Sequence, residues 1–280
     1  MSILDVRPVT DCVGAEVSGA RPEELAHEPE MAGAILDALE THGVLVFRQL
    51  NLTPEQQVAF SSHIGEIDYT PGHHPVAGIY RVTLDRSKNT AASYLRATFH
   101  WHVDGCTPTD GRCPQMATVL TAQAIADRGG ETEFASTYVA YDALTRIERE
   151  WFASLRVLHS LEASQRRAFS NPSAEHVQRW RSQPTSVHPL VWTHRSGRRS
   201  LLVGATTDYV VGMERDAGRA LLDQLLTRAT TPARVYRHEW AVGDTVVWDN
   251  RGVLHRVEPY DLASPREMLR TTILGDEPIQ

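Results

Sequence analysis

The sequence of 280 residues has few features of a membrane protein or of a disulfide-stabilised secreted protein. No apolar run approaches the roughly 18 residues that a membrane-spanning helix requires. The first residues lack a basic stretch followed by an apolar one, so we expect no secretory signal. The three cysteines, Cys12, Cys106 and Cys113, form neither a disulfide framework nor a paired zinc-type spacing. These absences favour a location in the reducing cytoplasm.

Signatures of several other classes of function are also missing. The sequence contains no Gly-rich phosphate loop and no G-x-S-x-G nucleophile elbow. A net charge of -7 argues against nucleic acid or an anionic membrane as a partner, while still allowing a local basic pocket. Because we find no internal repeat and no low-complexity linker, we expect residues 1–280 to form a single domain.

The pattern along the chain predicts a mainly-β fold with flanking helices. Thr53 and Pro54 are typical of a helix start, Gly43 can end an earlier helix, and Ile147 and Trp151 fall on the apolar side of a third. The expected helices are 31–39, 53–65, 141–155 and 215–230. The expected strands are 15–18, 43–48, 79–84, 116–122, 186–193, 200–203, 233–240, 245–249 and 269–274. Many short strands joined by turns suggest a sandwich or a jelly roll.

Two segments stand out from this pattern. Residues 68–98 are rich in turn-forming residues, and residues 163–187 hold many Arg, Ser, Gln and Pro residues. We expect both to be lids over a site, with ordinary surface loops as the alternative.

Residues 100–104, His-Trp-His-Val-Asp, carry the clearest chemical signal. In a β-strand, residues two apart point to the same face, so His102 and Asp104 could share one metal ion. On its own this pair is also compatible with a surface or capping pair. His255, which follows a turn at 248–251, is the best candidate for a second imidazole. Two histidines and one carboxylate with open positions are the ligand set of non-haem Fe(II) oxygenases.

Four stretches carry a recognisable pattern through their order and spacing along the chain: residues 101–104, 129–134, 248–255 and 266–272. With residues 43–48, they resemble the taurine dioxygenase and 2,4-dichlorophenoxyacetate dioxygenase group of Fe(II)/2-oxoglutarate-dependent oxygenases. Residues 188–191 and 236–240 are more similar to the phenoxyacetate enzymes. The resemblance implies a double-stranded β-helix (jelly roll) that binds Fe(II), 2-oxoglutarate and O2. It also implies a homo-oligomer, either a dimer or a tetramer.

The resemblance also implies residues for the cosubstrate. Thr132 and Arg266 would bind the C5 carboxylate of 2-oxoglutarate, and the planar guanidinium suits two parallel hydrogen bonds. From the sequence alone, Arg266 could equally pair with Glu267 or Glu277 at the surface. Asp104 argues against a halogenase, because the resembling halogenases vacate this carboxylate position for chloride.

Arg270 gives the main hint about the primary substrate. In a regular strand Arg266 and Arg270 share a face, about 13 Å apart. Two arginines inside a barrel are costly unless each meets an anion. By resemblance, the second anion is the carboxylate or sulfonate of the substrate. The alternative is that Arg270 pairs with Asp276 or Glu258.

Further candidate substrate contacts lie on either side of the metal motif. His73 and His74 fall where the resembling taurine enzymes supply a substrate-binding histidine, although Thr70 could occupy that place and a plain turn pair is the alternative. Val103 lies between the two proposed ligands and is a candidate substrate contact. We expect Cys106 to pack in the interior rather than to bind the metal.

The sequence thus predicts a dioxygenase that hydroxylates a small anionic substrate and releases succinate and CO2. Hydroxylation beside an ether or a sulfonate would lead to C–O or C–S cleavage. One alternative is the same chemistry, hydroxylation or desaturation, in the biosynthesis of a specialised metabolite. Another is a jelly-roll binding or sensor protein that keeps the metal without turnover.

Overall fold

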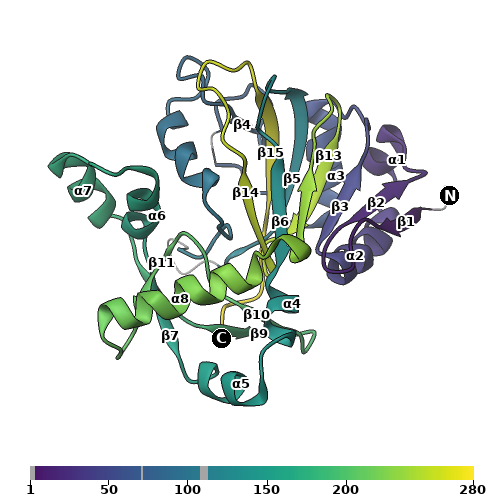
Figure 1. The fold of residues 1–280 in the computed structure, drawn as a ribbon. Coiled ribbons are helices and arrows are strands. Elements are labelled where there is room, and N and C mark those ends of the chain that lie inside the picture. The colour runs from purple at the N-terminus through teal and green to yellow at the C-terminus, as the bar shows by residue number, and fades with distance from the viewer. Residues whose placement is uncertain (1–3, 71, 108–112) are drawn as a thin grey trace.

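The computed structural model describes residues 4–70, 72–107 and 113–280, so the expectations at residues 1–3 and at Pro71 lie outside the described residues. A large sheet has the strand order β1-β2-β3-β13-β5-β15-β4, in which only β2 and β3 are parallel (Figure 1). Its strands are β1 (Asp5–Pro8), β2 (Ala15–Ser18), β3 (Val44–Phe47), β4 (Tyr80–Val82), β5 (Gln115–Ala124), β13 (Thr245–Asp249) and β15 (Glu267–Leu274).

A small antiparallel sheet faces the large one. Its strands, in the order β12-β6-β14, are β12 (Val235–His238), β6 (Thr132–Ser136) and β14 (Val253–Val257). Alternate residues of the large sheet point to it, since Val44 and Val46 pack in one cluster with Phe134 of β6. Their neighbours Leu45 and Phe47 pack on the other side. Two facing sheets with apolar side chains between them make a jelly roll, as predicted.

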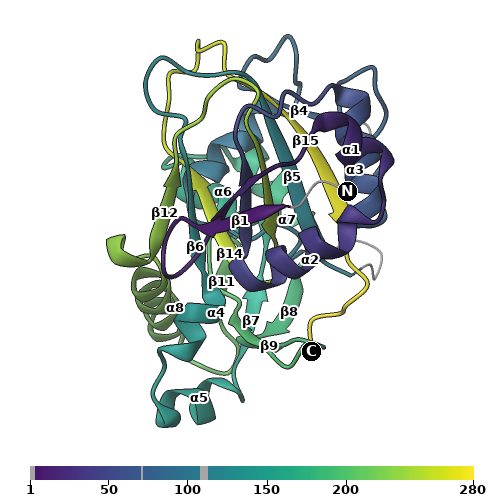
Figure 2. The same ribbon diagram turned by 90° about the vertical axis from the view of Figure 1, so that its right-hand side faces the viewer.

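Three helices cover the outer face of the large sheet: α1 (Pro22–His27), α2 (Met31–His42) and α3 (Pro54–Ile64). Figure 2 shows them on the side of the large sheet that faces away from the small sheet. The predicted caps are confirmed. Thr53 and Gln56 form a capping box at the start of α3. Gly43 ends α2 with φ 72°, a left-handed conformation that glycine adopts without strain.

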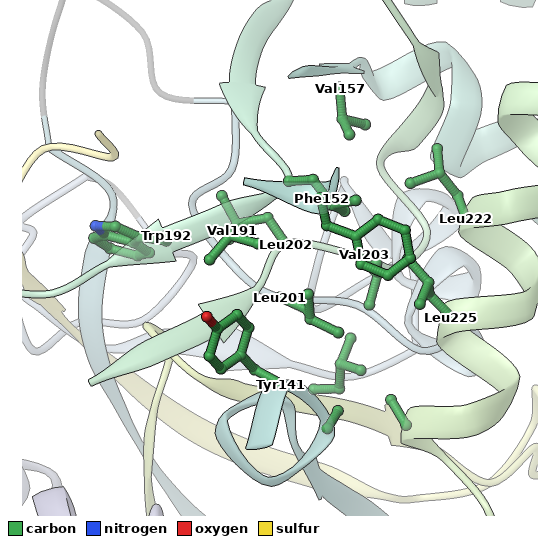
Figure 3. Close-up of a cluster of buried hydrophobic side chains, with 14 of the residues drawn as sticks. Tyr141, Phe152, Val157, Val191, Trp192, Leu201, Leu202, Val203, Leu222 and Leu225 are labelled. Carbon is green, nitrogen blue, oxygen red and sulfur yellow. The ribbon is translucent and has the colours of Figure 1, made fainter. Parts of the chain in front are cut away.

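The middle of the chain forms a second layer around its own core. It contains the sheet β11-β7-β8, the hairpin β9-β10 and the helices α4, α5 and α8. Figure 3 shows Leu222 and Leu225 of α8 facing Phe152 and Val203 in this apolar cluster. The bounds are β7 (Arg156–His159), β8 (Ser186–Pro189), β9 (Val191–Thr193), β10 (Arg199–Leu201), β11 (Thr207–Val210), α4 (Thr137–Asp142), α5 (Arg146–Phe152) and α8 (Arg215–Ala229).

Some predicted elements were wrong in extent. The single helix expected over 141–155 is interrupted, because Thr145 caps the separate helix α5. Ile147 and Trp151, expected on its apolar side, are 74% and 47% exposed. The strand expected over 186–193 divides into β8 and β9, and the one over 233–240 begins as the short 3-10 helix η2 (Pro232–Arg234).

The two predicted lid segments contain regular structure. Residues 68–98 include β4 and most of the 3-10 helix η1 (Ala92–Phe99). The second segment includes most of α6 (Leu161–Ala168) and all of α7 (Ala174–Arg181), which lie at the left edge of Figure 1, where α6 contacts β11 and η1. Among the described residues, no helix is both long and apolar enough to cross a bilayer.

Candidate metal and cosubstrate site

Three side chains from distant parts of the chain meet between the two sheets. One ligand atom from each of His102, Asp104 and His255 lies within 4.8 Å of the other two. Nε2 of His102 is 3.7 Å from Oδ1 of Asp104, and Nε2 of His255 is 3.8 Å from Oδ2. The imidazole rings are 4.1 Å apart between centroids. Two imidazoles and one carboxylate so close together suit a single transition-metal ion.

The backbone brings the two histidines together in a way that we did not predict. Residues 100–104 are not a strand, because only His102 pairs, in one antiparallel bridge with His255. The two backbone hydrogen bonds of this bridge measure 3.0 and 2.9 Å. Asp104 follows in a turn, where Gly105 has φ 83° and a Cβ atom would lie 2.6 Å from the nitrogen of Gln115. The turn replaces the strand and still directs the carboxylate toward both rings.

Burial sets the charge state of this cluster. Burial and the neighbouring His102 lower the pKa of His255 to about 3, so its imidazole is neutral at neutral pH. Burial alone would raise the pKa of Asp104, but the attraction of His255, His102 and Arg270 outweighs it and keeps this pKa below its usual value. A neutral imidazole and an ionised carboxylate are the forms that bind metal.

Arg266 lies just before β15 and is 2% exposed. Its Nε donates to the carbonyl of Gly130 over 3.2 Å, and its guanidinium lies 5.0 Å from the ring centroid of Tyr260. A Cβ atom at Gly130 would lie 3.0 Å from Arg266, so glycine makes room for this side chain. Its buried NH2 group has no hydrogen-bond partner in the described parts of the chain, and the alternative pairs with Glu267 or Glu277 are not formed there.

Thr132 faces the same interior. It is 1% exposed, and its Oγ1 accepts a hydrogen bond of 3.0 Å from Nε1 of Trp240. In the small sheet, Thr132 pairs with Val257, two residues from His255 on β14. The inner face of this sheet therefore carries both the hydroxyl and one of the three clustered side chains.

Arg270 approaches the cluster from the large sheet. Its NH1 lies 3.9 Å from Oδ2 of Asp104, and its guanidinium lies over the ring of Tyr80 at 4.8 Å. Its buried Nε has no hydrogen-bond partner among residues 4–70, 72–107 and 113–280. The expected alternatives do not occur, because Asp276 pairs with Arg195 and Glu258 pairs with Arg256 instead.

The other candidate residues lie farther out or deeper in the interior. His73 is exposed and packs edge-on against Tyr80 at 6.3 Å. His74 accepts a hydrogen bond from the backbone of Val76, and no contact joins it to the three-residue cluster in the described structure. Val103 is 5% exposed and packs in the core around α8. Cys106 is buried too, and burial raises the pKa of its thiol to about 12, which agrees with a packing role.

Both expected groups fit the residues present. The donor atoms of His102, Asp104 and His255 match what Fe(II) binds in oxygenases. The buried guanidinium of Arg266 forms no ion pair among the described residues and keeps a free NH2 group, so it needs an anion, because leaving a buried charge unpaired is costly. A dicarboxylate such as 2-oxoglutarate would supply that anion.

Sequence reasoning assigned no role to three aromatic residues that support the site. Tyr260 and Tyr80 lie under the two arginines, and Trp240 holds Thr132. Tyr80 and Trp240 stood within stretches that we had noted, the expected strands over 79–84 and 233–240, whereas Tyr260 did not. Aromatic residues in strand-rich sequences are usually core, so their positions alone carry no signal for these contacts.

Comparison with known proteins agrees with this site. Residues 5–272 match the family described as taurine catabolism dioxygenase TauD, TfdA family. An (S)-phenoxypropionate/alpha-ketoglutarate-dioxygenase of Sphingobium herbicidovorans is 32% identical over an alignment 286 residues long, which spans 98% of this chain and 96% of that protein. An alpha-ketoglutarate-dependent 2,4-dichlorophenoxyacetate dioxygenase of Cupriavidus pinatubonensis is 35% identical over 253 residues, covering 85% and 86%.

A solved structure shares the whole fold. The crystal structure of AAD-2 in complex with Mn(II) and N-oxalylglycine has a TM-score of 0.83 and 30% sequence identity to this chain. The match covers 99% of this chain and 100% of that one. The likeness therefore extends over both sheets and the surrounding helices.

Proposed function

The chain belongs to the taurine catabolism dioxygenase TauD, TfdA family, and from this premise we propose that His102, Asp104 and His255 bind the iron that its reaction requires. As a member, the protein is an Fe(II)- and 2-oxoglutarate-dependent dioxygenase. Bound iron and 2-oxoglutarate supply the oxidation, in which O2 is consumed, succinate and CO2 are released, and the substrate gains a hydroxyl group.

Arg266 and Thr132 bind the C5 carboxylate of 2-oxoglutarate. The single observation that carries this assignment is that Arg266 is buried with an NH2 group that no described residue bonds. Its guanidinium can donate to a carboxylate, and its Nε is already held by Gly130. Thr132 can add a hydroxyl hydrogen bond, because its oxygen accepts from Trp240 and its proton remains available.

Arg270 binds the anionic group of the primary substrate. Its contact with Asp104 over 3.9 Å places this cation beside the proposed metal ligands. Tyr80 supports the flat side of the guanidinium, which leaves its edge for a second anion. His73 packs on Tyr80 and is the better placed of the two histidines for a substrate contact, whereas Val103 contributes through the core behind the ligands.

We take aryloxy carboxylates as the first substrate class to test. The two curated relatives described above act, by their names, on phenoxypropionate and on 2,4-dichlorophenoxyacetate, each a carboxylate beside an ether oxygen. Hydroxylation of the carbon that bears the ether gives a hemiketal or hemiacetal. Its C–O bond breaks as the hydroxyl loses its proton, which releases a phenol and a 2-oxo acid. The family resemblance further supports a dimer or a tetramer, and the cysteine pattern supports a cytoplasmic location.

The experiment is a succinate-release screen with the purified, iron-loaded protein. Its panel contains phenoxyacetates, phenoxypropionates, alkanesulfonates and sulfate esters, with a sample lacking substrate as the control. We expect one aryloxy acid to give succinate and a phenol in equal amounts. A stable alcohol as the sole product would show that hydroxylation is not followed by C–O cleavage. Absence of substrate-dependent succinate across the panel would overturn the proposed substrate class.

A further inference from the structure

A pocket lies between the two segments predicted to be lids. One wall comes from residues 86–94, and the other comes from α6 and α7. Its volume of about 340 Å³ falls within the range of small-molecule sites. None of the residues that line it belongs to the metal or cosubstrate site proposed above.

The floor of this interlid pocket carries a buried amide. Gln165 of α6 is 2% exposed, and its Oε1 has no hydrogen-bond partner in the described parts of the chain. Burying an acceptor without a hydrogen-bond partner is unfavourable. The described residues supply no donor for this oxygen, and a bound water or a ligand in the pocket that Gln165 lines can supply one. An N–H or O–H group of a ligand would do so.

The walls are aromatic. Phe169, His176 and Trp180 contact one another, with ring centroids 5.8 Å apart for His176 and Trp180 and 5.8 Å apart for Phe169 and Trp180. Trp180 is 3% exposed, so its indole is a fixed surface rather than a mobile side chain. Rings of this kind favour a planar aromatic ligand, which stacks or packs edge-on at little entropic cost.

The mouth of the pocket is cationic. Arg86 and Arg179 line it and are exposed. Arg179 hydrogen-bonds to Tyr94 of the opposite wall, and neither arginine forms an ion pair with a carboxylate in the described structure. Arg96 lies over the outer wall, 5.3 Å from the ring of Phe169. The two guanidinium groups that line the opening favour an anionic substituent on the ligand.

A second arginine-rich hollow differs in this respect. It lies between α6, β11 and α8, and each of its arginines is already paired with an acidic residue. The pairs are Arg166 and Arg181 with Glu162, Arg167 with Asp223, and Arg215 and Arg219 with Asp208. An incoming anion would have to displace these carboxylates, so the interlid pocket is the better anion site.

A row of contacts connects the interlid pocket to the active site. Arg270 lies over Tyr80, Tyr80 packs against His73, and Nε2 of His73 is 3.4 Å from Oγ1 of Thr90 in the pocket wall. This row of contacts joins Thr90 in the pocket wall to Arg270 of the proposed substrate site.

We propose that the interlid pocket binds a planar aromatic group that carries an anionic substituent and an N–H or O–H donor for Gln165. This chemistry can come from a separate small molecule or from the far end of an extended primary substrate. The proposed binding does not depend on the reaction. A failed succinate screen would therefore not affect it, because the pocket is tested by a binding measurement.

The test is calorimetric titration of the full chain, loaded with Fe(II) and 2-oxoglutarate without O2, so that nothing turns over. The probe is indole-3-acetate, and its matched control is 1-methylindole-3-acetate, which lacks the N–H. We expect the control to bind roughly fivefold more weakly, the cost of one neutral hydrogen bond. Gln165→Leu, which keeps the volume, should remove this difference.

A second variant tests the mouth without touching the buried floor. Arg179→Gln should weaken indole-3-acetate and leave the neutral probe indole-3-acetamide unchanged. Binding should be retained in Arg270→Gln, because Arg270 does not line the pocket; loss of binding there would place the probe in the proposed substrate site and overturn the proposal. The proposal is overturned if indole-3-acetate does not bind the wild type at millimolar concentration, or if the N–H preference persists in Gln165→Leu.

Discussion

Trp240 donates the hydrogen of its indole Nε1 to Oγ1 of Thr132 over 3.0 Å. An indole nitrogen cannot accept a hydrogen bond, so the proton of the Thr132 hydroxyl points elsewhere. Both residues are buried, so the hydroxyl oxygen is held in place before any ligand arrives, with its proton free for another acceptor. Trp240 thus positions the group that we assign to the cosubstrate carboxylate.

Trp240→Phe tests this positioning role. It removes the N–H and keeps most of the ring, so we expect 2-oxoglutarate binding to weaken by about 1 kcal/mol, roughly fivefold. Calorimetry with Mn(II)-loaded protein measures this without turnover. Trp151→Phe, at a partly exposed position away from the site, is the control. Adding Trp240→Phe to Thr132→Val should cost little more than Thr132→Val alone, and full additivity would count against the coupling.

Arg266→Gln should weaken 2-oxoglutarate binding much more. Removing one partner of a buried charge pair costs on the order of 2–5 kcal/mol, which is at least roughly thirtyfold in the dissociation constant. Arg266→Lys keeps the charge but loses the planar fork, so we expect an intermediate value. The same calorimetric titration provides both numbers. Wild-type affinity in Arg266→Gln would show that the cosubstrate binds elsewhere.

Arg270→Gln should affect the other ligand. Its guanidinium lies near Asp104, so we expect a raised KM for the primary substrate and an unchanged dissociation constant for 2-oxoglutarate. The comparison uses the substrate that releases succinate in the screen. A loss confined to 2-oxoglutarate would mean that the roles of Arg266 and Arg270 are exchanged.

His159 predicts a pH dependence of stability. It is 1% exposed on β7, and burial with the nearby His188 lowers its pKa to about 3. The unfolded chain takes up this proton near pH ~6.5, whereas the folded protein does not until about pH 3. Between these values the unfolded state binds more protons, so the free energy of unfolding falls as the pH falls, by up to about 1.4 kcal/mol per pH unit for this group.

His159→Asn isolates that contribution. The Asn oxygen can keep the contact that Nδ1 makes with Oγ1 of Thr206 over 3.0 Å. Urea unfolding from neutral pH to about pH 5 should then show a shallower loss of stability in the variant. Equal slopes in the two proteins would mean that His159 is already protonated in the fold.

Local patterns were sufficient for much of the fold. The capping box at Thr53 and the left-handed Gly43 depend on neighbours in the sequence, and both lie where we expected them. The prediction of one long helix over 141–155 was wrong, although the sequence contains a signal for its interruption. Thr145 and Glu148 form a second capping box, a start signal that apolar periodicity concealed.

The site also combines features that the sequence predicts with features that depend on how distant segments pack. Residue type and order predicted that His102, Asp104 and His255 form one site, and the structure places their donor atoms within 4.8 Å of one another. The bridge between His102 and His255 was not predictable, because it joins segments more than a hundred residues apart. The contact from Trp240 to Thr132 is of the same kind, since it depends on the pairing of β12 with β6.

Iron binding tests the central claim most directly. Anaerobic titration of the metal-free protein with Fe(II), followed by 2-oxoglutarate, should show one equivalent of bound iron and a visible Fe(II)–2-oxoglutarate charge-transfer band. His255→Ala and Asp104→Ala should each lose the tight site and the band, because each removes one of three converging donors. If either variant binds one equivalent of iron as tightly as the wild type and keeps the band, then these three side chains are not the iron ligands.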